Sequence, residues 1–325
     1  MSEIRRVSED SKDVAVFRSL AEVPAGFGPS VVTIGNFDGV HRGHRKILSA
    51  VVSEARGMNA RAVAITFDPH PDRLLRPTKA PQLLTPLCER LRLLTGTGVD
   101  AVLVLGFDAA LAALEARQFV ESILVGGLGV RSVHEGQSFR FGHLAAAGVS
   151  ELAAFGSEFG FRVRVHEPVR VHGLEVSSSA IRALAASGDM RRARWMLGRP
   201  FAILSTQARG RGIGTRLLVP TVNLAHYDGL LPAFGVYVTR LKVAGRVFQA
   251  VTNVGNRPTF GEDSFAVESH ILDFEPVEMD ETTPIELKFL LRLRGEIRFP
   301  SPEALKAQIF RDVARAERYF RLTGR

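Results

Sequence analysis

The chain is short of the features that mark secreted and membrane proteins. Its one cysteine, Cys88, excludes an intrachain disulfide and is typical of a reducing compartment. It has no apolar run near the ~20 residues that a membrane-spanning helix needs. Residues 1–14 are polar and charged, without the apolar core of a secretory signal. We therefore expect a cytoplasmic protein with no membrane partner.

Acidic residues are fewer than basic ones, 34 against 42, which gives a net charge of +8. Most of the basic residues are arginines, whose planar guanidinium groups can donate two hydrogen bonds to one phosphate. The excess of arginine therefore favours polyanionic substrates such as ATP. A nucleic-acid partner is the competing interpretation. The arginines are scattered, however, with no basic stripe interleaved with aromatics, so we expect no nucleic-acid partner. The sequence does not indicate an oligomeric state.

With 325 residues, 46% of them hydrophobic, the chain predicts two globular domains. In the first, strand-like and helical segments alternate, which predicts an α/β fold with a doubly wound parallel sheet. We expect its strands at residues 31–37, 61–67, 101–107, 130–135 and 161–166. We expect its helices at residues 42–56, 85–97, 109–126 and 148–160. A last helix is expected after residues 176–179; it runs to about residue 197 and is interrupted near Ser187 and Gly188.

The pattern changes at about residues 198–201, so we place the domains at 1–198 and 199–325. Short strand-like runs follow without crossover helices, which predicts a small antiparallel β-barrel. We expect these strands at residues 201–205, 236–243, 246–254, 266–273 and 285–294. Ser301 and Pro302 begin a terminal helix. Its apolar residues are expected to pack on the barrel: Leu305, Ile309, Val313 and Phe320.

The most informative segment is residues 31–44, which reads VVTIGNFDGVHRGH. A buried strand leads through a glycine-rich turn into a helix, and the first N–H groups of a helix attract anions. His41 and His44 are spaced to lie on one side of that turn. A bare His-x-x-His pair is usually a surface coincidence or part of a metal site, but this context favours a nucleotide-phosphate site. The predicted cradle comprises Gly35, Asn36, Phe37, Asp38, His41, Gly43 and His44.

Two later segments are predicted to complete this site. Residues 67–71, FDPHP, fix a turn at the carboxyl edge of the sheet, with His70 as a substrate-side wall or a hydrogen-bonded structural residue. A helix then opens on Ser177, Ser178 and Ser179, with Arg182 one turn later. Ordinary N-capping is the alternative for these hydroxyls. In the phosphate-site hypothesis, His41, His44 and Arg182 stabilise charge on the α-phosphoryl group of a Mg²⁺-bound nucleotide.

The second domain has phosphate and metal signals of its own. Gly210, Gly212 and Gly214 form a glycine-rich loop that can offer N–H groups to an anion. Thr221 and Asn223, two apart on an extended segment, can both reach a hard cation. Glu268 lies in an apolar strand-like run and is either a salt-bridged structural residue or a general base.

Taken in order, these motifs resemble those of the prokaryotic bifunctional riboflavin kinase/FMN adenylyltransferases, or FAD synthetases. The resemblance extends over about residues 14–322. The segments that carry it are GNFDGVHRGH (35–44), FDPHP (67–71), FRFG (139–142), SSSAIR (177–182), PTVN (220–223), TNVGNRPTF (252–260) and ESH (268–270).

The resemblance implies two ATP-dependent steps, riboflavin to FMN in the barrel and FMN to FAD in the nucleotidyltransferase domain. Thr221 and Asn223 would hold Mg·ATP, and Glu268 would deprotonate the ribityl hydroxyl. Substrate contacts would include Ser138, Asn253 and Arg257. Ser138 replaces the family's Asp or Asn, and Ala180 replaces an Arg, so adenylylation is expected at altered efficiency. The alternatives are a monofunctional riboflavin kinase with a regulatory first domain, and a flavin-sensing protein without turnover.

Overall fold

The computed structural model describes residues 14–208, 221–256, 265–273 and 275–324. The chain divides into two compact units. The first contains the residues up to Pro81 together with Pro86–Val176, and the second contains Gln82–Thr85 and Ser177–Arg325. Within the described residues, we find no helix with the length and apolar character to span a bilayer.

The first unit is built on a six-stranded sheet with the order β1-β4-β3-β2-β5-β6, in which every neighbouring pair is parallel. This confirms the doubly wound parallel sheet. The edge strand β1 was not expected from the sequence, because its three residues are too few to show a pattern. The strands are β1 Ala15–Phe17, β2 Ser30–Ile34, β3 Arg61–Asp68, β4 Ala101–Gly106, β5 Val130–Gly136 and β6 Arg162–His166.

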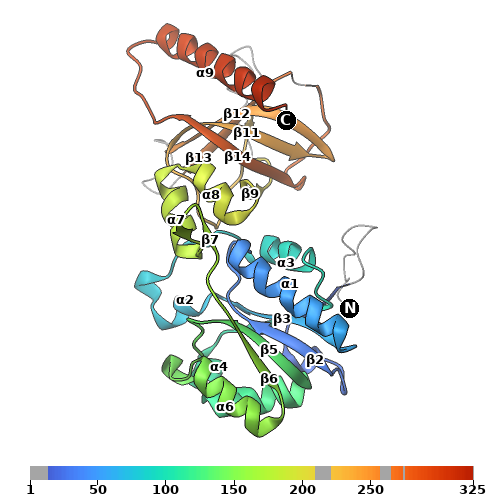
Figure 1. Ribbon diagram of the computed structural model, residues 1–325. Helices are drawn as coiled ribbons and strands as arrows, with labels where there is room; N and C mark the ends of the chain where they lie inside the picture. Colours follow the sequence, from blue (N-terminus) through green and yellow to red (C-terminus); the bar gives the residue numbers. More distant parts are fainter. Residues whose placement is uncertain (1–13, 209–220, 257–264, 274, 325) are drawn as a thin grey trace. The chain divides into compact units, whose positions relative to one another are not determined.

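Helices cover both faces of this sheet, as Figure 1 shows. On one face, Leu48 of α1 and Leu94 of α3 pack on the apolar side of the strands. On the other, Leu124 and Leu152 pack with Val32 and Ile65. The helices are α1 Arg42–Gly57, α2 Pro71–Leu75, α3 Leu87–Thr95, α4 Ala109–Ala113, α5 Ala116–Phe119 and α6 Val149–Phe159. Shorter elements are η1 Leu20–Glu22, η2 Pro77–Lys79, η3 Val120–Gly127, η4 His143–Ala145 and the hairpin β7 Arg170–Val171 with β8 Leu174–Glu175.

The helix predicted over residues 109–126 is divided into α4, α5 and the π-helical η3. Leu114 has an extended backbone, which ends α4. A capping box between Glu115 and Gln118 then starts α5. Local capping therefore overrides an apolar periodicity that reads as continuous.

The strand order places a topological switch point between β2 and β5. From β2 the chain proceeds outward to β3 and β4, and it then returns to the other side of β2 for β5 and β6. Ligands of doubly wound sheets bind at the carboxyl ends of the strands that flank such a point. The turn that follows β2 contains the cradle residues, so the fold places the predicted phosphate site there.

The second unit holds a six-stranded antiparallel sheet with the order β10-β13-β12-β11-β14-β9. Its outer strands approach each other just beyond their ends, where Gln207 and Leu224 form an antiparallel bridge. This closure confirms the small barrel. The strands are β9 Phe201–Ser205, β10 Thr221–Asn223, β11 Gly235–Val243, β12 Arg246–Asn256, β13 Phe265–Ile271 and β14 Ile285–Arg294, accompanied by the helices α7 Ser178–Ser187, α8 Met190–Leu197 and α9 Pro302–Thr323.

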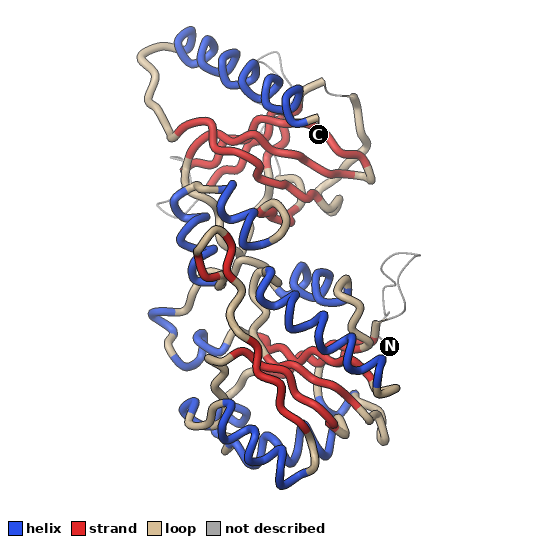
Figure 2. The backbone as a smooth tube through the Cα atoms, in the orientation of Figure 1, coloured by secondary structure: helices blue, strands red, loops and turns tan. Residues whose placement is uncertain are grey.

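The terminal helix α9 lies across this sheet (Figure 2). Ala316 and Phe320 are buried against Val236 and Val238 of β11. The prediction that the whole apolar stripe packs on the barrel is wrong for Leu305 and Ile309, which are 39% and 40% exposed. They occupy the first turns of α9, whereas the apolar cluster forms in its later turns.

The compact units separate at residues 176 and 177 because α7 and α8 group with the antiparallel sheet. Contacts of α8 with β9 and β14 account for this grouping. The predicted boundary after residue 198 instead follows the change from alternating helices and strands to consecutive strands. The boundary after residue 198 remains a proposal about where the two predicted domains meet in the sequence.

Candidate functional site

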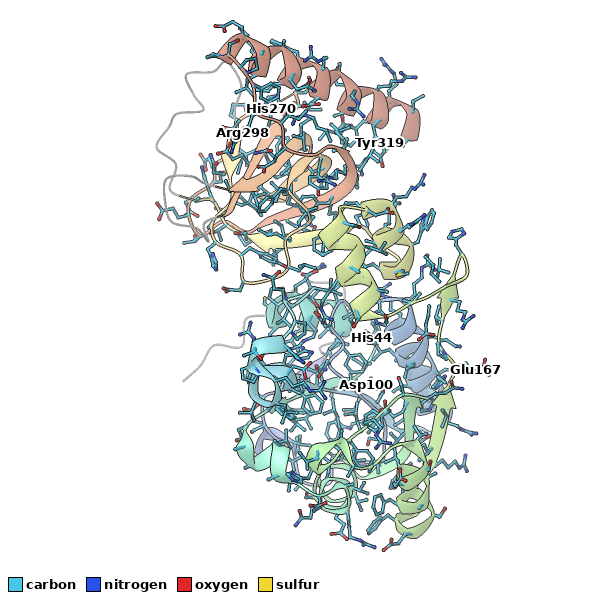
Figure 3. All side chains as sticks on the ribbon, turned by 90° about the vertical axis from the view of Figure 1, so that its left-hand side faces the viewer. His44, Asp100, Glu167, His270, Arg298 and Tyr319 are labelled. Carbon is cyan, nitrogen blue, oxygen red and sulfur yellow. The ribbon has the colours of Figure 1, made fainter. Side chains whose placement is uncertain are left out.

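His41 and His44 lie together in the first turn of α1, as the sequence predicts. The side chain of His41 is the N-cap, and its Nδ1 accepts a hydrogen bond from the His44 backbone N–H at 3.3 Å. When neutral, this imidazole therefore carries its proton on Nε2. The two rings stack with centroids 3.6 Å apart and an interplanar angle of 17°. The pair is thus a single rigid unit at the helix N-terminus (Figure 3 labels His44).

The surroundings of His44 keep its ring neutral. Its pKa lies well below the ordinary value, first because burial removes the charged form from water and second because His41 is adjacent. The edge of Phe37 packs on the ring with centroids 5.2 Å apart. Nδ1 of His44 has no contact with solvent and no hydrogen-bond partner among the described residues. At neutral pH, His44 acts as a neutral imidazole and not as a cation.

The backbone of the turn is held in an unusual conformation. Phe37 and Val40 have φ values of +48° and +36°, and both side chains are buried. Non-glycine residues seldom adopt positive φ unless the surrounding structure enforces it, and such positions concentrate at ligand sites. At Gly43, a Cβ atom would lie 3.1 Å from two atoms of the His41 ring. A side chain at this position would therefore be tight against the His41 ring, which would have to shift by a few tenths of an ångström to make room.

The second motif meets the first through a side-chain contact. Nδ2 of Asn36 lies 3.2 Å from Nε2 of His70. His70 is 6% exposed and caps α2, since its Nδ1 accepts from the Asp72 backbone N–H at 3.2 Å. The structure thus brings residues 36 and 70 together. Of the two interpretations of His70, hydrogen-bonded structure is observed, and the substrate-side wall stays a prediction.

Glu135, next to the last residue of β5, lies at this edge of the sheet, and the sequence interpretation did not single it out. Its Oε1 accepts a hydrogen bond from the Ile34 backbone N–H at 2.6 Å, across the switch point. The carboxyl group is buried, which raises its pKa well above the ordinary value, although hydrogen bonds from Ile34 and Thr33 act in the opposite direction. The signal in the sequence was an acidic residue at the end of a buried strand.

Ser138 follows two residues after β5 and is exposed in a turn at the same carboxyl edge. Parallel neighbours β2 and β5 end at this edge, so the position fits the predicted contact with substrate.

The predicted serine cluster belongs to the second unit. Ser177 is the N-cap of α7, and its Oγ accepts from the Ala180 backbone N–H at 3.2 Å. Ordinary capping therefore accounts for Ser177. Nε of Arg182 donates to the Gln82 carbonyl oxygen at 3.0 Å. The roles of Ser178, Ser179 and Arg182 toward a nucleotide remain predictions.

In the barrel, strand register brings three predicted residues side by side. Asn223 of β10 pairs with Glu268 of β13, which pairs in turn with Asn253 of β12. Side chains directly opposite each other across strands share a face, so the three form one row. Glu268 and Asn253 are exposed on it. Gly210, Gly212, Gly214 and Arg257 lie outside the described residues.

The amide oxygen of Asn223 suits a cation. This Oδ1 is shielded from solvent and has no hydrogen-bond partner among the described residues. Thr221 lies two positions earlier on β10, so it presents its hydroxyl on the same face. Uncharged oxygen donors of this kind are ligands of Mg²⁺, which prefers oxygen. The residues present therefore fit a magnesium-bound phosphate.

Two of the strands that carry this row, β12 and β13, are tied to each other and to β11 on the opposite face. Hydroxyl groups of Thr239, Thr252 and Ser269 form a hydrogen-bonded series with oxygen separations of 2.7 Å and 2.8 Å, all fully buried. These bonds link β11, β12 and β13 and help to hold the register of Asn253 and Glu268.

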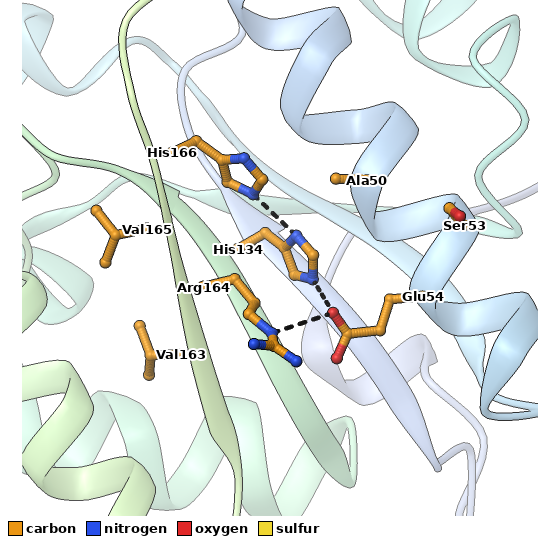
Figure 4. A pocket seen from close by; sticks show the side chains of 8 residues that line it. All are labelled: Ala50, Ser53, Glu54, His134, Val163, Arg164, Val165 and His166. Atoms are coloured by element: carbon orange, nitrogen blue, oxygen red, sulfur yellow. Dashed lines mark hydrogen bonds and ion pairs between the residues drawn. The ribbon is translucent and has the colours of Figure 1, made fainter.

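A separate open pocket of about 630 Å³ lies between α1 and the strands β5 and β6 (Figure 4). Glu54, His134 and His166 form a hydrogen-bonded chain there: Nε2 of His134 lies 2.8 Å from the Glu54 carboxylate and Nδ1 lies 3.0 Å from His166 Nε2. Burial lowers the pKa of His134 despite its acidic partner. Among the described residues, no cluster of His, Cys, Asp or Glu side chains is arranged to hold a metal ion. The hydrogen-bonded trio of Glu54, His134 and His166 links α1 to β5 and β6.

Two family models match the chain in succession, FAD synthetase over residues 25–180 and riboflavin kinase over residues 197–320. A protein of Escherichia coli (strain K12) named bifunctional riboflavin kinase/FMN adenylyltransferase is 38% identical over 295 residues, which cover 90% of this chain and 93% of that protein. A Haemophilus influenzae protein of the same name is 32% identical over 290 residues, covering 89% and 94%.

A solved structure supports the fold. The crystal structure of a Streptococcus pneumoniae protein described as a macrolide-efflux protein superposes with a TM-score of 0.84. The two chains are 25% identical, and the match covers 94% of this chain and 98% of that one.

Proposed function

The chain belongs to the family of bifunctional riboflavin kinase/FMN adenylyltransferases, and we propose that its His41–His44 turn and its Asn223–Glu268–Asn253 row are the two active sites. The enzyme phosphorylates riboflavin to FMN and adenylylates FMN to FAD. Both family models and the bifunctional relatives favour this function over a monofunctional kinase. The observation that carries the assignment of the first site is the stacked imidazole pair at the switch point of the parallel sheet.

In the proposed adenylylation site, the N-terminus of α1 receives the phosphates of ATP. A phosphate oxygen of FMN attacks the α-phosphorus, the bond to the β-phosphate bridging oxygen breaks, and pyrophosphate leaves. Because His44 is held neutral, the imidazoles stabilise the developing charge as N–H donors within the positive field of the helix terminus. The predicted contribution of Ser138 is part of this proposal, whereas Arg182 belongs to the second unit and its role toward the nucleotide stays a prediction from the sequence.

In the proposed kinase site, Glu268 accepts the proton of the ribityl 5′-hydroxyl while that oxygen attacks the γ-phosphorus of ATP. ADP leaves, and FMN is formed. The neighbouring Asn223 and Thr221 are the residues that would hold Mg²⁺, which would neutralise charge on the phosphates. Asn253, on the other side of Glu268, would orient the substrate hydroxyl or the carboxylate.

Product analysis tests this proposal. Purified protein is incubated with riboflavin, ATP and Mg²⁺, and flavins and nucleotides are separated by chromatography. Two different bonds of ATP are broken, so each FAD formed from riboflavin should be accompanied by one ADP and one pyrophosphate. FMN with ADP but no FAD would show a kinase alone, and no product would show a flavin-binding protein. Omission of Mg²⁺ should abolish both steps.

A further inference from the structure

Arg90 of α3 is a fully buried cation that lies between the two motif turns of the first unit. Its Nη1 donates to the Asn36 carbonyl oxygen at 2.9 Å. Its Nη2 donates to the Phe67 carbonyl oxygen, also at 2.9 Å. Asn36 belongs to the turn after β2, and Phe67 is next to the last residue of β3. One guanidinium group thus joins the backbones of both motifs.

The same group balances the acidic residues of both turns. Nη2 lies 3.7 Å from Oδ1 of Asp68. Asp38, which is 1% exposed, also interacts favourably with the Arg90 charge. Burial of an arginine is costly unless its charge and its donors are matched. Each motif therefore supplies one carbonyl oxygen and one carboxylate to a single buried cation.

The contact extends from the backbone of Asn36 to its side chain. The Asn36 carbonyl oxygen accepts a second hydrogen bond from Thr66 Oγ1 at 3.2 Å. With its backbone held by two donors, Asn36 has a fixed position from which its amide meets His70 at 3.2 Å. Arg90 and His70 are thereby coupled through one residue of the cradle.

We propose that Arg90 is a positioning residue for adenylyl transfer, which locks the Gly35–Asp38 turn onto the Phe67–His70 turn. This inference rests on the proposed function of the first unit. The guanidinium group is enclosed by protein and acts on the nucleotide only through the turns that it joins. A lysine keeps the charge, but its single ammonium group lacks the fork that reaches two carbonyl oxygens at once.

The test compares Arg90→Lys with Arg92→Lys as a matched control. Arg92 lies on the same helix, and its half-exposed side chain pairs with Glu89 at 2.6 Å. For each variant, kcat and KM of FMN adenylylation and the rate of riboflavin phosphorylation are measured per folded molecule, well below Tm. Arg90→Lys should lower the adenylylation kcat about 10-fold or more, because small displacements of reacting groups greatly reduce the rate of the chemical step. KM for ATP should change by less than about 3-fold.

Riboflavin phosphorylation should be unchanged in both variants, and Arg92→Lys should adenylylate at the wild-type rate. A wild-type adenylylation kcat in folded Arg90→Lys would overturn the inference. Should that variant fail to fold, Thr66→Val removes the second donor to the Asn36 carbonyl oxygen without changing the side-chain shape. It should lower kcat by about 2- to 5-fold, and a wild-type kcat would overturn the inference. If the wild-type protein made no FAD from FMN, the proposed function itself would fail before any variant is compared.

Discussion

The imidazole rings of His41 and His44 stack at 3.6 Å, and one of them is fixed by a backbone hydrogen bond from the other residue. A single turn of helix thus supplies two imidazoles and the positive end of a helix dipole to the same small volume. Neither ring needs a charge for this purpose, because a neutral N–H donor is sufficient in a water-poor site.

Replacement of His44 by alanine should remove one of these donors. We expect kcat for the adenylylation of supplied FMN to fall about 100-fold or more, as for other preorganised donors to a transition-state charge. Riboflavin phosphorylation should stay within about 2-fold of the wild-type rate, since Glu268 lies in the other unit. His172→Ala, at an exposed position of the first unit, is the control. An unchanged adenylylation rate in His44→Ala would exclude the phosphate role of the pair.

Substitution of Gly43 by alanine tests the placement of the His41 ring. The new methyl group would lie 3.1 Å from two ring atoms and would displace the imidazole. Adenylylation should therefore fall about 10-fold or more, although alanine is the better helix former. Gly57→Ala, at the end of the same helix, meets no atom within 4 Å and should leave the rate unchanged. Equal rates in both variants would show that the ring has room to move.

Glu135 should make the stability of the first unit depend on pH. Its folded-state pKa is raised above the unfolded value of 4.5, so the stability that the protonated carboxyl contributes is present below 4.5 and is lost as pH rises. Glu135→Gln mimics the protonated group at every pH. We expect this variant to raise Tm by about 2–4 °C near pH 8 and to change it little near pH 4.5.

Thermal unfolding at a series of pH values measures this difference. The control is Glu167→Gln, which replaces an exposed carboxylate and should leave the pH profile as in the wild type. A lower Tm of Glu135→Gln at pH 8 would mean that the ionised carboxylate stabilises the strand ends, contrary to the expectation.

Glu268 is the test residue of the barrel. Glu268→Gln keeps the shape of the side chain but cannot accept the hydroxyl proton, so riboflavin phosphorylation should fall about 100-fold or more. Adenylylation of supplied FMN should persist. Glu278→Gln, an exposed position of the same unit, should behave as the wild type. Near-wild-type phosphorylation by Glu268→Gln would assign Glu268 to structure and leave the base unidentified.

Much of this architecture is predictable because its signals are local. The β-branched run before Gly35, the helical spacing of His41 and His44, and the alternation of elements all lie within short segments, and the structure confirms them. The barrel was predictable in the same way, from short strands without crossover helices.

The residues that the sequence did not reveal act through long-range pairing. Arg90 reads as an ordinary helical arginine until the fold brings α3 between two turns. Glu135 can be distinguished from other strand residues only in the folded protein, because β2 ends beside it and the Ile34 backbone N–H donates to its carboxyl group. The prediction that Leu305 and Ile309 pack on the barrel was wrong for a related reason. Periodicity shows which face of a helix is apolar, but it does not show how far along that face the sheet extends.

The most direct test of two independent active sites on this chain is one chromatographic measurement on two variants. His44→Ala is supplied with riboflavin, and Glu268→Gln is supplied with FMN, each with ATP and Mg²⁺. We expect the first variant to accumulate FMN without FAD and the second to convert FMN to FAD at the wild-type rate. Failure of folded His44→Ala to form FMN, or of folded Glu268→Gln to form FAD, would contradict two independent active sites.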